Sequence, residues 1–395
     1  MDTKIAGGIL LIVGTSIGAG MLALPIVTAE SGFLMSVLTM FLCWGIMTFS
    51  AFLILEVNLW MPPGNNIITM AKKTLGKPGA LVAWVSFLLL LYTLLSAFIS
   101  GGSDLFNSLT AKTGLQTPLW LDSVLFVIIF GFIVFRGIKP VDYVNRALMT
   151  IKLTFLFILI SFAFPHVKAQ QLAAGHPLLF TSTITVTLTS FGFANIIPSL
   201  RSYFDSDIKK LRQAILIGSL IPFVCYFFWN LSILGAVPRD NILNIMQTGG
   251  SVALLTQSLS DYLNNDSISI IAHIFTAICV LTSFLCVSLS LVDFLADGLH
   301  IKKKGFGNII INCITFLPPL ILVIFYPSIF TQALNYAGII CLVLLVLLPA
   351  LMVYSGRYKK GLSIGHYQVL GGRGAVIFLG ILAVFIISLA VKETF

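Results

Sequence analysis

Apolar residues occur along this chain in long runs, not in the alternating or one-sided patterns that strands and helices show in soluble proteins. A run of about 20 apolar residues is long enough to cross the hydrocarbon core of a bilayer as a helix. The pattern therefore predicts an all-α integral membrane protein. We expect eleven membrane-spanning helices, at 5–28, 33–60, 80–102, 119–136, 143–165, 180–200, 213–236, 268–297, 306–326, 329–355 and 373–391.

The composition agrees with lipid as the main solvent of this protein. Of the 395 residues, 58% are hydrophobic and 9% are charged, too few charges to cover a soluble protein of this length. The six Cys form no CxxC pair, and the five His show no spacing typical of metal ligands. We therefore expect no disulfide framework, no metal site and no cofactor.

The basic residues predict how the chain is oriented. With a cytoplasmic N-terminus, 18 of the 23 Lys and Arg lie in loops on the inside, four lie outside, and Lys152 falls within a span. Positive loops stay in the cytoplasm, so this bias predicts an inside N-terminus and, with eleven spans, an outside C-terminus. Because these charges are topology signals in short loops, the net charge of +9 does not indicate a nucleic-acid partner.

The first and sixth apolar runs are interrupted at matching positions. The two interruptions are Gly14-Thr15-Ser16-Ile17-Gly18-Ala19-Gly20 before Pro25, and Thr189-Ser190-Phe191-Gly192-Phe193-Ala194-Asn195 before Pro198. They share Thr-Ser-x-Gly at a separation of 174 residues, and each opens a set of five predicted helices. Because five is odd, the second set, 180–355, would be inverted relative to the first set, 1–165, and the helix at 373–391 would lie outside both. Interrupted helices at corresponding positions of two inverted halves point to a transporter's substrate site.

The interruptions have a direct physical consequence. Glycines lower helix propensity and a downstream proline removes a backbone donor, so each helix can unwind at mid-membrane. The freed N–H and C=O groups then need partners, which a zwitterion or a cation can supply. The alternative is that Gly14 and Gly18 form a small-residue packing face without binding anything. The candidate substrate contacts are Thr15, Ser16, Ile17, Gly18, Ala19, Gly20, Ser190, Phe191, Gly192, Phe193, Ala194 and Asn195.

Aromatic residues near the interruptions allow two interpretations each. Phe191 and Phe193 could stack on an aromatic substrate or gate its site, or they could simply face lipid, since Phe is abundant in this chain. Tyr92, in the middle of the third predicted helix, could donate its hydroxyl to a substrate carboxylate. It could equally bond to a neighbouring helix.

The sequence resembles the bacterial aromatic amino acid permeases, the tyrosine- and tryptophan-specific transporters, essentially from end to end. The resemblance is carried by residues 14–25, Leu55-Glu56-Val57, Ser190-Phe191-Gly192-Phe193, Pro198-Ser199, Thr282-Ser283-Phe284-Leu285, Asp293-Phe294-Leu295-Ala296-Asp297 and Phe316-Leu317-Pro318-Pro319. It implies a leucine-transporter-type fold of two inverted five-helix repeats with a further helix, in the bacterial inner membrane with a periplasmic C-terminus. It also implies import of an aromatic amino acid by proton symport, with tyrosine favoured and tryptophan or phenylalanine also open. Members usually have His-Gly after Ser-Phe-Gly-Phe, whereas Ala194-Asn195 stand here, and this difference alters the expected pocket wall.

The candidates for cation coupling are Lys152, Thr282, Ser283 and Glu56. In the implied fold a Thr-Ser pair on the eighth helix faces the first helix and helps to hold sodium, and Lys152 on the fifth helix could replace that sodium. Burial disfavours the charged ammonium, so release of its proton could couple transport to protons. The alternatives are a sodium-coupled symporter and, for Lys152, snorkelling to the interface. We expect Asp293 and Asp297 to pair with basic loop residues, and Glu56 either to do so or to relay protons.

Two other classes of protein are less compatible with the sequence than a transporter. Residues 14–18 match GxSxG with Ser16 as a nucleophile, but the strand-turn-helix context of a serine hydrolase is absent, so we expect no enzyme. A channel is disfavoured because no ring of carbonyl-filter or acidic residues is evident. The expected partners are an aromatic amino acid, a proton and membrane lipid, and we expect a monomer.

Overall fold

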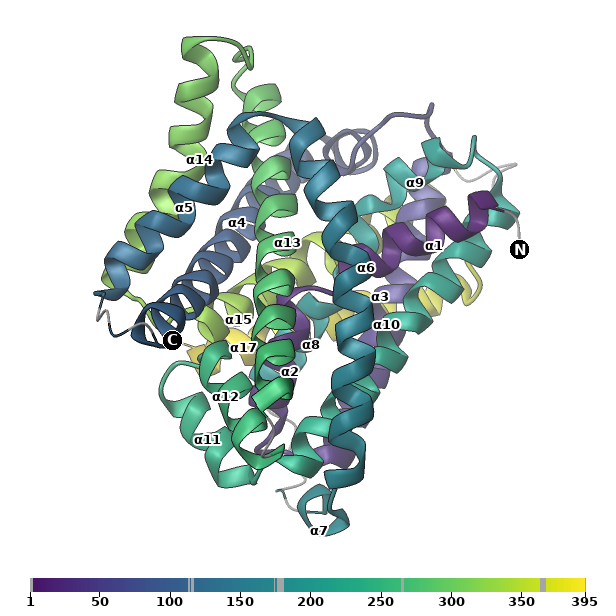
Figure 1. Cartoon of the computed structure of the whole chain (residues 1–395). Coiled ribbons are helices and arrows are strands. Elements are labelled where there is room, and N and C mark those ends of the chain that lie inside the picture. Colours follow the sequence, from purple (N-terminus) through teal and green to yellow (C-terminus); the bar gives the residue numbers. More distant parts are fainter. Residues whose placement is uncertain are drawn as a thin grey trace.

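The computed structural model is a bundle of helices that are inclined to one another at various angles (Figure 1). It describes residues 3–112, 114, 117–173, 175, 181–263, 266–362 and 367–394, and this part of the chain contains no strand. The helices of the first half are α1 (Thr3–Ser16), α2 (Ala19–Thr28), α3 (Gly32–Leu59), α4 (Ile67–Lys112), α5 (Leu119–Phe135), α6 (Ile138–Ala163) and the short turns η1 (Phe164–His166) and α7 (Ala169–Leu172).

The second half begins with an interrupted element and ends with a single long helix. Its helices are α8 (Thr181–Ser190), η2 (Phe193–Ile196), α9 (Ile197–Tyr203), α10 (Ile208–Ala236), α11 (Arg239–Gln247), α12 (Val252–Leu263), α13 (Asp266–Gly298), α14 (Phe306–Phe325), α15 (Phe330–Cys341), the π-helical η3 (Leu342–Leu347), α16 (Leu348–Tyr358) and α17 (Gly372–Thr394).

The predicted spans correspond to these helices. Within the described residues, nine helices are long and apolar enough to cross a membrane, and the pair α1–α2, bent by 52°, makes a tenth span. The eleventh is α5, an apolar helix of 17 residues at the short end of the length that spans a bilayer. All eleven predicted runs therefore have a helical counterpart, and the chain is a multi-pass membrane protein.

The largest difference from the predicted boundaries is in α4. It begins at Ile67, thirteen residues before the predicted start at 80, and includes a break at Gly76 (φ 80°, ψ −162°). That positive φ is costly for residues other than glycine, and Pro78 follows it, so the first turns form a separate segment against the longer helix. The apolar pattern could not reveal this segment because it is too polar to look like a span.

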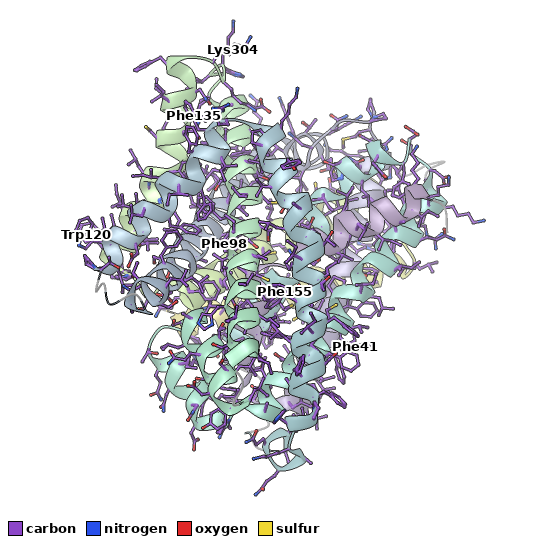
Figure 2. The ribbon with its side chains drawn as sticks, viewed as in Figure 1. Phe41, Phe98, Trp120, Phe135, Phe155 and Lys304 are labelled. Atoms are coloured by element: carbon purple, nitrogen blue, oxygen red, sulfur yellow. The ribbon has the colours of Figure 1, made fainter. Side chains whose placement is uncertain are left out.

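Exposed apolar side chains cover the outside of the bundle. Phe41 and Trp120 are among the labelled residues of Figure 2 and are more than half exposed, whereas Phe98 is buried against the core. Such a continuous apolar exterior is typical of a surface that faces lipid. The elements that hold the interruptions lie inside: α2, which is almost entirely buried, packs on α8 and also contacts α13.

Candidate functional site

The first interruption lies at Ile17 and Gly18, between α1 and α2. The helical hydrogen bonds of α1 continue to Ile17 N–H, which donates to Val13 O at 2.8 Å. Gly18 then adopts an extended conformation (φ −154°, ψ −154°), and the next backbone bond of this segment joins Met21 N–H to Gly18 O at 3.1 Å. The predicted discontinuity of the first span is confirmed, and it leaves backbone groups between the two helices without helical partners.

Lys152 from α6 reaches one of these freed groups. Its ammonium donates to Ile17 O at 2.6 Å and lies 3.3 Å from Thr282 Oγ1 on α13. The side chain is 1% exposed, so it does not snorkel to the membrane surface. Within the described part of the chain, no ion pair joins Lys152 to a carboxylate. The ammonium is therefore held in the interior by neutral oxygen atoms.

Ser283, the neighbour of Thr282, satisfies a second freed group. Its hydroxyl accepts a hydrogen bond from Ala19 N–H at 2.9 Å. The approach is so close that a Cβ atom on Gly18 would lie 2.3 Å from Ser283 Oγ. Glycine at this position is needed for the contact between α13 and the interruption, and the structure brings Lys152, Thr282 and Ser283 together around it.

The second interruption follows Ser190, at Phe191 and Gly192. Phe193 N–H donates to Phe191 O at 2.8 Å, a tight three-residue turn that leads into η2 instead of continuing α8. The discontinuity predicted for the sixth span is thus confirmed. The two interruptions lie against each other, because a Cβ on Gly20 would come within 3.0 Å of Ser190 Oγ.

Tyr226 on α10 touches both interruptions, and sequence reasoning missed it. Its hydroxyl lies 2.6 Å from Ser16 O and 2.9 Å from Ser190 O, and the side chain is fully buried. A signal was available: Tyr226 lies in the middle of the seventh predicted span, where a buried hydroxyl needs a hydrogen-bond partner. The pattern could not show which helices supply that partner.

The structure separates the other candidate contacts into two groups. Phe191, Phe193 and Ala194 are completely buried, which excludes a lipid-facing position for the two phenylalanines. Thr15 and Asn195 are exposed, and Thr15 donates to Leu11 O of its own helix at 2.8 Å. Their roles as substrate contacts stay predictions.

Tyr92 makes the contact with a neighbouring helix that was one of its two predicted roles. Its hydroxyl donates to Ile314 O on α14 at 2.8 Å, and the ring is half-buried. It is thus engaged by a neighbouring helix and is not bonded to either interruption. A contact between Tyr92 and substrate stays a prediction.

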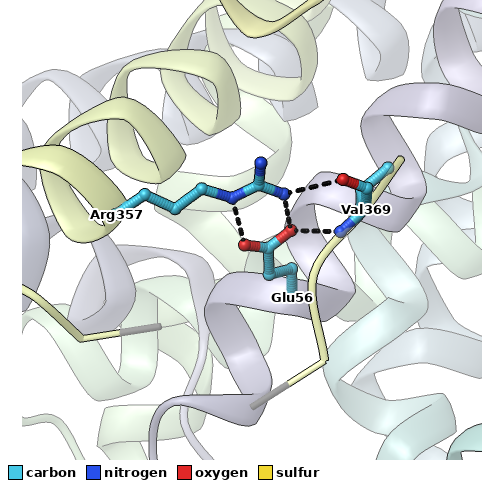
Figure 3. Close-up of polar contacts among 3 residues, drawn as sticks. All are labelled: Glu56, Arg357 and Val369. Carbon is cyan, nitrogen blue, oxygen red and sulfur yellow. Dashed lines mark hydrogen bonds and ion pairs between the residues drawn. The ribbon is translucent and has the colours of Figure 1, made fainter. Parts of the chain in front are cut away.

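Glu56 lies away from the interruptions, near the C-terminal end of α3 (Figure 3). Arg357 donates to it through Nε at 2.6 Å and through Nη2, and Val369 N–H donates to the same carboxylate at 2.8 Å. Arg357 Nη2 also donates to Val369 O at 3.0 Å. Both charged side chains are buried. The carboxylate therefore joins α3, the end of α16 and the segment before α17, and a relay role for Glu56 stays a prediction.

Asp293 shows the pairing expected from the sequence. Its carboxylate lies 2.5 Å from the ammonium of Lys303, in the loop between α13 and α14. Both side chains are partly exposed, so this ion pair is a surface feature and not part of the interior site.

The comparisons with known proteins agree with this geometry. Residues 1–390 match the tryptophan/tyrosine permease family. The chain is 33% identical over 393 residues to tyrosine-specific transport system 1 of Haemophilus influenzae, covering 98% of this chain and 96% of that protein. It is 30% identical over 399 residues to glutamine transporter 2 of Aliivibrio fischeri, covering 100% of both. These relatives are transport proteins, which supports the predicted transporter class over an enzyme.

The fold also has a solved counterpart. The crystal structure of MhsT in complex with L-phenylalanine aligns with a TM-score of 0.65 at 16% identity, covering 98% of each chain. This likeness confirms the predicted leucine-transporter-type fold, while the division into two inverted five-helix repeats stays a prediction. Since the family match extends over nearly the whole sequence and the fold and interrupted helices agree with it, the chain belongs to the tryptophan/tyrosine permease family.

Proposed function

We propose that this protein imports an aromatic amino acid, with tyrosine favoured, together with a proton across the inner membrane of a bacterium. The substrate would bind where the two interruptions meet, at residues 16–20 and 190–194. The N-terminus would be cytoplasmic and the C-terminus periplasmic, as the distribution of Lys and Arg indicates. Alternating exposure of this site to the two sides would move the substrate.

The observation that carries the proposal is the position of Lys152. Its ammonium donates to Ile17 O, a carbonyl of the first interruption, and lies near Thr282. A carbonyl and a hydroxyl oxygen are ligands that also suit a sodium ion, and here the Lys152 ammonium supplies the positive charge. Because the ammonium has only neutral partners among the described residues, loss of its proton would leave no buried countercharge unpaired. Protonation of Lys152 would hold α6 and α13 against the interruption, and deprotonation would release them.

An aromatic substrate is supported by the family and by the side chains at the second interruption. Phe191 is buried against Tyr226, with ring centroids 5.0 Å apart, so aromatic surface lies next to the freed backbone groups. Aromatic rings favour offset or edge contacts with another ring, which would add to the affinity for an aromatic amino acid. The freed backbone groups would bind the amino and carboxylate groups common to every amino acid.

The test is uptake of labelled tyrosine into proteoliposomes that contain the purified protein. We expect saturable uptake that rises with an inward proton gradient and does not require sodium. Tryptophan and phenylalanine should compete, and glutamine, the substrate named for one relative, should not. Uptake driven by a sodium gradient and not by a proton gradient would overturn the role of Lys152. Competition by glutamine alone would overturn the aromatic substrate.

A further inference from the structure

The hydroxyl of Tyr226 connects two segments that are far apart in sequence. Its oxygen lies within hydrogen-bonding distance of Ser16 O, at the end of α1, and of Ser190 O, at the end of α8. Each of these carbonyls belongs to an interruption, where the helix no longer supplies a donor for it. One side chain on α10 thus reaches the freed carbonyl groups of both broken helices.

The two carbonyl oxygens can accept more hydrogen bonds than the single hydroxyl of Tyr226 can donate. A phenol carries one hydrogen, so Tyr226 can donate to Ser16 O or to Ser190 O, or share the hydrogen between them. Both oxygens must nevertheless lie close to the same hydroxyl, which limits how far apart they can be. The carbonyl that receives the smaller share keeps capacity to accept a further bond from a bound molecule.

The ring of Tyr226 reinforces this connection. It packs at 5.0 Å, centroid to centroid, on Phe191, the first residue of the second interruption, and the whole side chain is excluded from solvent. The orientation of the phenol is therefore set by packing as well as by its hydrogen bonds. A rigid, buried ring is suited to hold two backbone segments in register.

We propose that Tyr226 is the positioning residue of the transport site: it holds the two interruptions at the spacing that the substrate's backbone groups require. This proposal rests on the proposed function. The hydroxyl of Tyr226 acts on the protein backbone, so it does not distinguish a substrate with a ring hydroxyl from one without. The loss of that hydroxyl should weaken binding of every aromatic amino acid to a similar extent.

The kinetic test is Tyr226→Phe, which removes the hydroxyl and keeps the ring contact with Phe191. We expect the KM for tyrosine and for phenylalanine to rise by a similar factor, on the order of tenfold, because a buried carbonyl loses its donor. Vmax should change by less than about twofold. A larger loss for tyrosine than for phenylalanine, or an unchanged KM, would overturn the proposal.

Ser355→Ala provides a matched control. Ser355 on α16 also donates a buried hydroxyl to a carbonyl of another helix, Thr74 O on α4 at 2.7 Å, and α16 packs mainly on α3, α4, α17 and η3. Its loss should lower thermal stability without raising KM. A rise in KM equal to that of Tyr226→Phe would show that any lost buried hydroxyl has this effect, and would also overturn the proposal.

A second measurement does not depend on transport and so separates this proposal from the proposed function. Amide hydrogen exchange of residues 16–21 and of residues 190–194 should become faster in Tyr226→Phe, on the order of tenfold in both, and in neither for Ser355→Ala. If the substitution prevents folding, a fluorinated tyrosine at 226, which is a stronger donor, should slow exchange in both segments. Faster exchange in one segment only, or no change with either replacement, would contradict the proposal even if the wild-type protein transports no aromatic amino acid.

Discussion

Lys152 and Arg357 are both buried basic residues of this protein, yet they have different partners. Arg357 faces the carboxylate of Glu56 through two of its nitrogens, and a backbone N–H completes the set of bonds to that carboxylate (Figure 3). Lys152 faces a backbone carbonyl and a hydroxyl, with no carboxylate paired to it among the described residues. The charge of Arg357 is compensated by a carboxylate, whereas the charge of Lys152 has only neutral hydrogen-bond partners.

This difference indicates which of the two basic side chains, Lys152 or Arg357, can lose its proton. A guanidinium stays protonated in proteins, and a bidentate pair with a carboxylate fixes both charges. A buried lysine with neutral partners can lose its proton without leaving a second charge uncompensated. This contrast supports the proposal that proton coupling lies at Lys152, whereas the bonds of the Glu56–Arg357 pair connect the ends of α3 and α16.

The largest effect is expected from Lys152→Met, which keeps an unbranched side chain one atom shorter and removes the ammonium. Proton-driven accumulation of tyrosine should be abolished, because no group at the interruption would then bind and release the proton. Exchange of internal for external tyrosine should persist, which distinguishes loss of coupling from loss of folding. Both can be measured in proteoliposomes with and without a pH gradient. Accumulation by the Lys152→Met protein that still follows the proton gradient would remove Lys152 from the mechanism.

The next largest effect is expected from the buried ion pair of Glu56 and Arg357. Glu56→Gln leaves the guanidinium of Arg357 buried without its counter-charge, which we expect to cost about 3–5 kcal/mol of stability. The measurement is thermal unfolding of the purified protein in detergent. Transport by the protein that remains folded should still follow the proton gradient, unlike that of Lys152→Met.

A double variant sharpens this prediction. Replacing both partners, as Glu56→Leu with Arg357→Met, removes both buried charges and should recover most of the stability lost in Glu56→Gln. A double variant as unstable as the sum of the two single variants would show that the two side chains do not act as a pair. Loss of proton coupling in Glu56→Gln would restore the relay role considered for Glu56.

A smaller effect is expected from Gly18→Ala at the first interruption. The added Cβ would lie 2.3 Å from Ser283 Oγ, so this hydroxyl must rotate away from Ala19 N–H or α13 must shift. The cost of about 1–3 kcal/mol should appear as slower tyrosine uptake. Adding Ser283→Ala removes the clashing oxygen and should restore part of the rate, although the bond to Ala19 N–H is lost. If the double variant is slower than Gly18→Ala alone, the close contact is not the cause.

The smallest effect is expected at a surface ion pair. Lys4 on α1 lies 2.5 Å from Asp205, and both side chains are substantially exposed, so Lys4→Gln should change uptake and stability very little. The hydrogen bond from Lys4 holds the pKa of Asp205 below its ordinary range. The pair therefore contributes at neutral pH, and its contribution is lost as pH falls through the lowered pKa of Asp205. The unfolding temperature should fall slightly less between neutral and acidic pH in Lys4→Gln than in the wild-type protein. A large difference in unfolding temperature between the two proteins at neutral pH would contradict the small effect expected here.

Much of the fold could be predicted from the sequence because a helix in lipid must have an apolar sequence. A span must be apolar over its length and must satisfy its own backbone, so each apolar run became a helix. The short basic segment before Gly76 is not among the predicted spans because it is too polar to cross a membrane. The turn at Gly76 joins it to the rest of α4 through a conformation that favours glycine, and no hydrophobic pattern marks such a turn.

The candidate site was predicted in part. The glycines of residues 14–20 and the Thr-Ser-x-Gly repeat located both interruptions, since unwinding is a local property of the chain. A charge within an apolar run identified Lys152 in the same way. Pairing with a basic residue was one of the two roles predicted for Glu56, but the sequence did not identify Arg357, in the last turn of α16, as the partner. Tyr226 was missed because its place in the middle of a span shows that its hydroxyl needs a partner, but not which helices supply it.

The sequence by itself determined that the chain is an integral membrane protein, where its helices lie, and where the first and sixth spans unwind. These features follow from the transfer of side chains into lipid and from the local propensities of glycine and proline, which need no knowledge of neighbours. The tertiary structure alone decided that Lys152, Ser283 and Tyr226, from three different helices, satisfy freed groups of the first interruption. Those pairings depend on how helices separated by more than a hundred residues pack together, because a buried polar group is stabilised by whichever partner the packing brings within hydrogen-bonding distance.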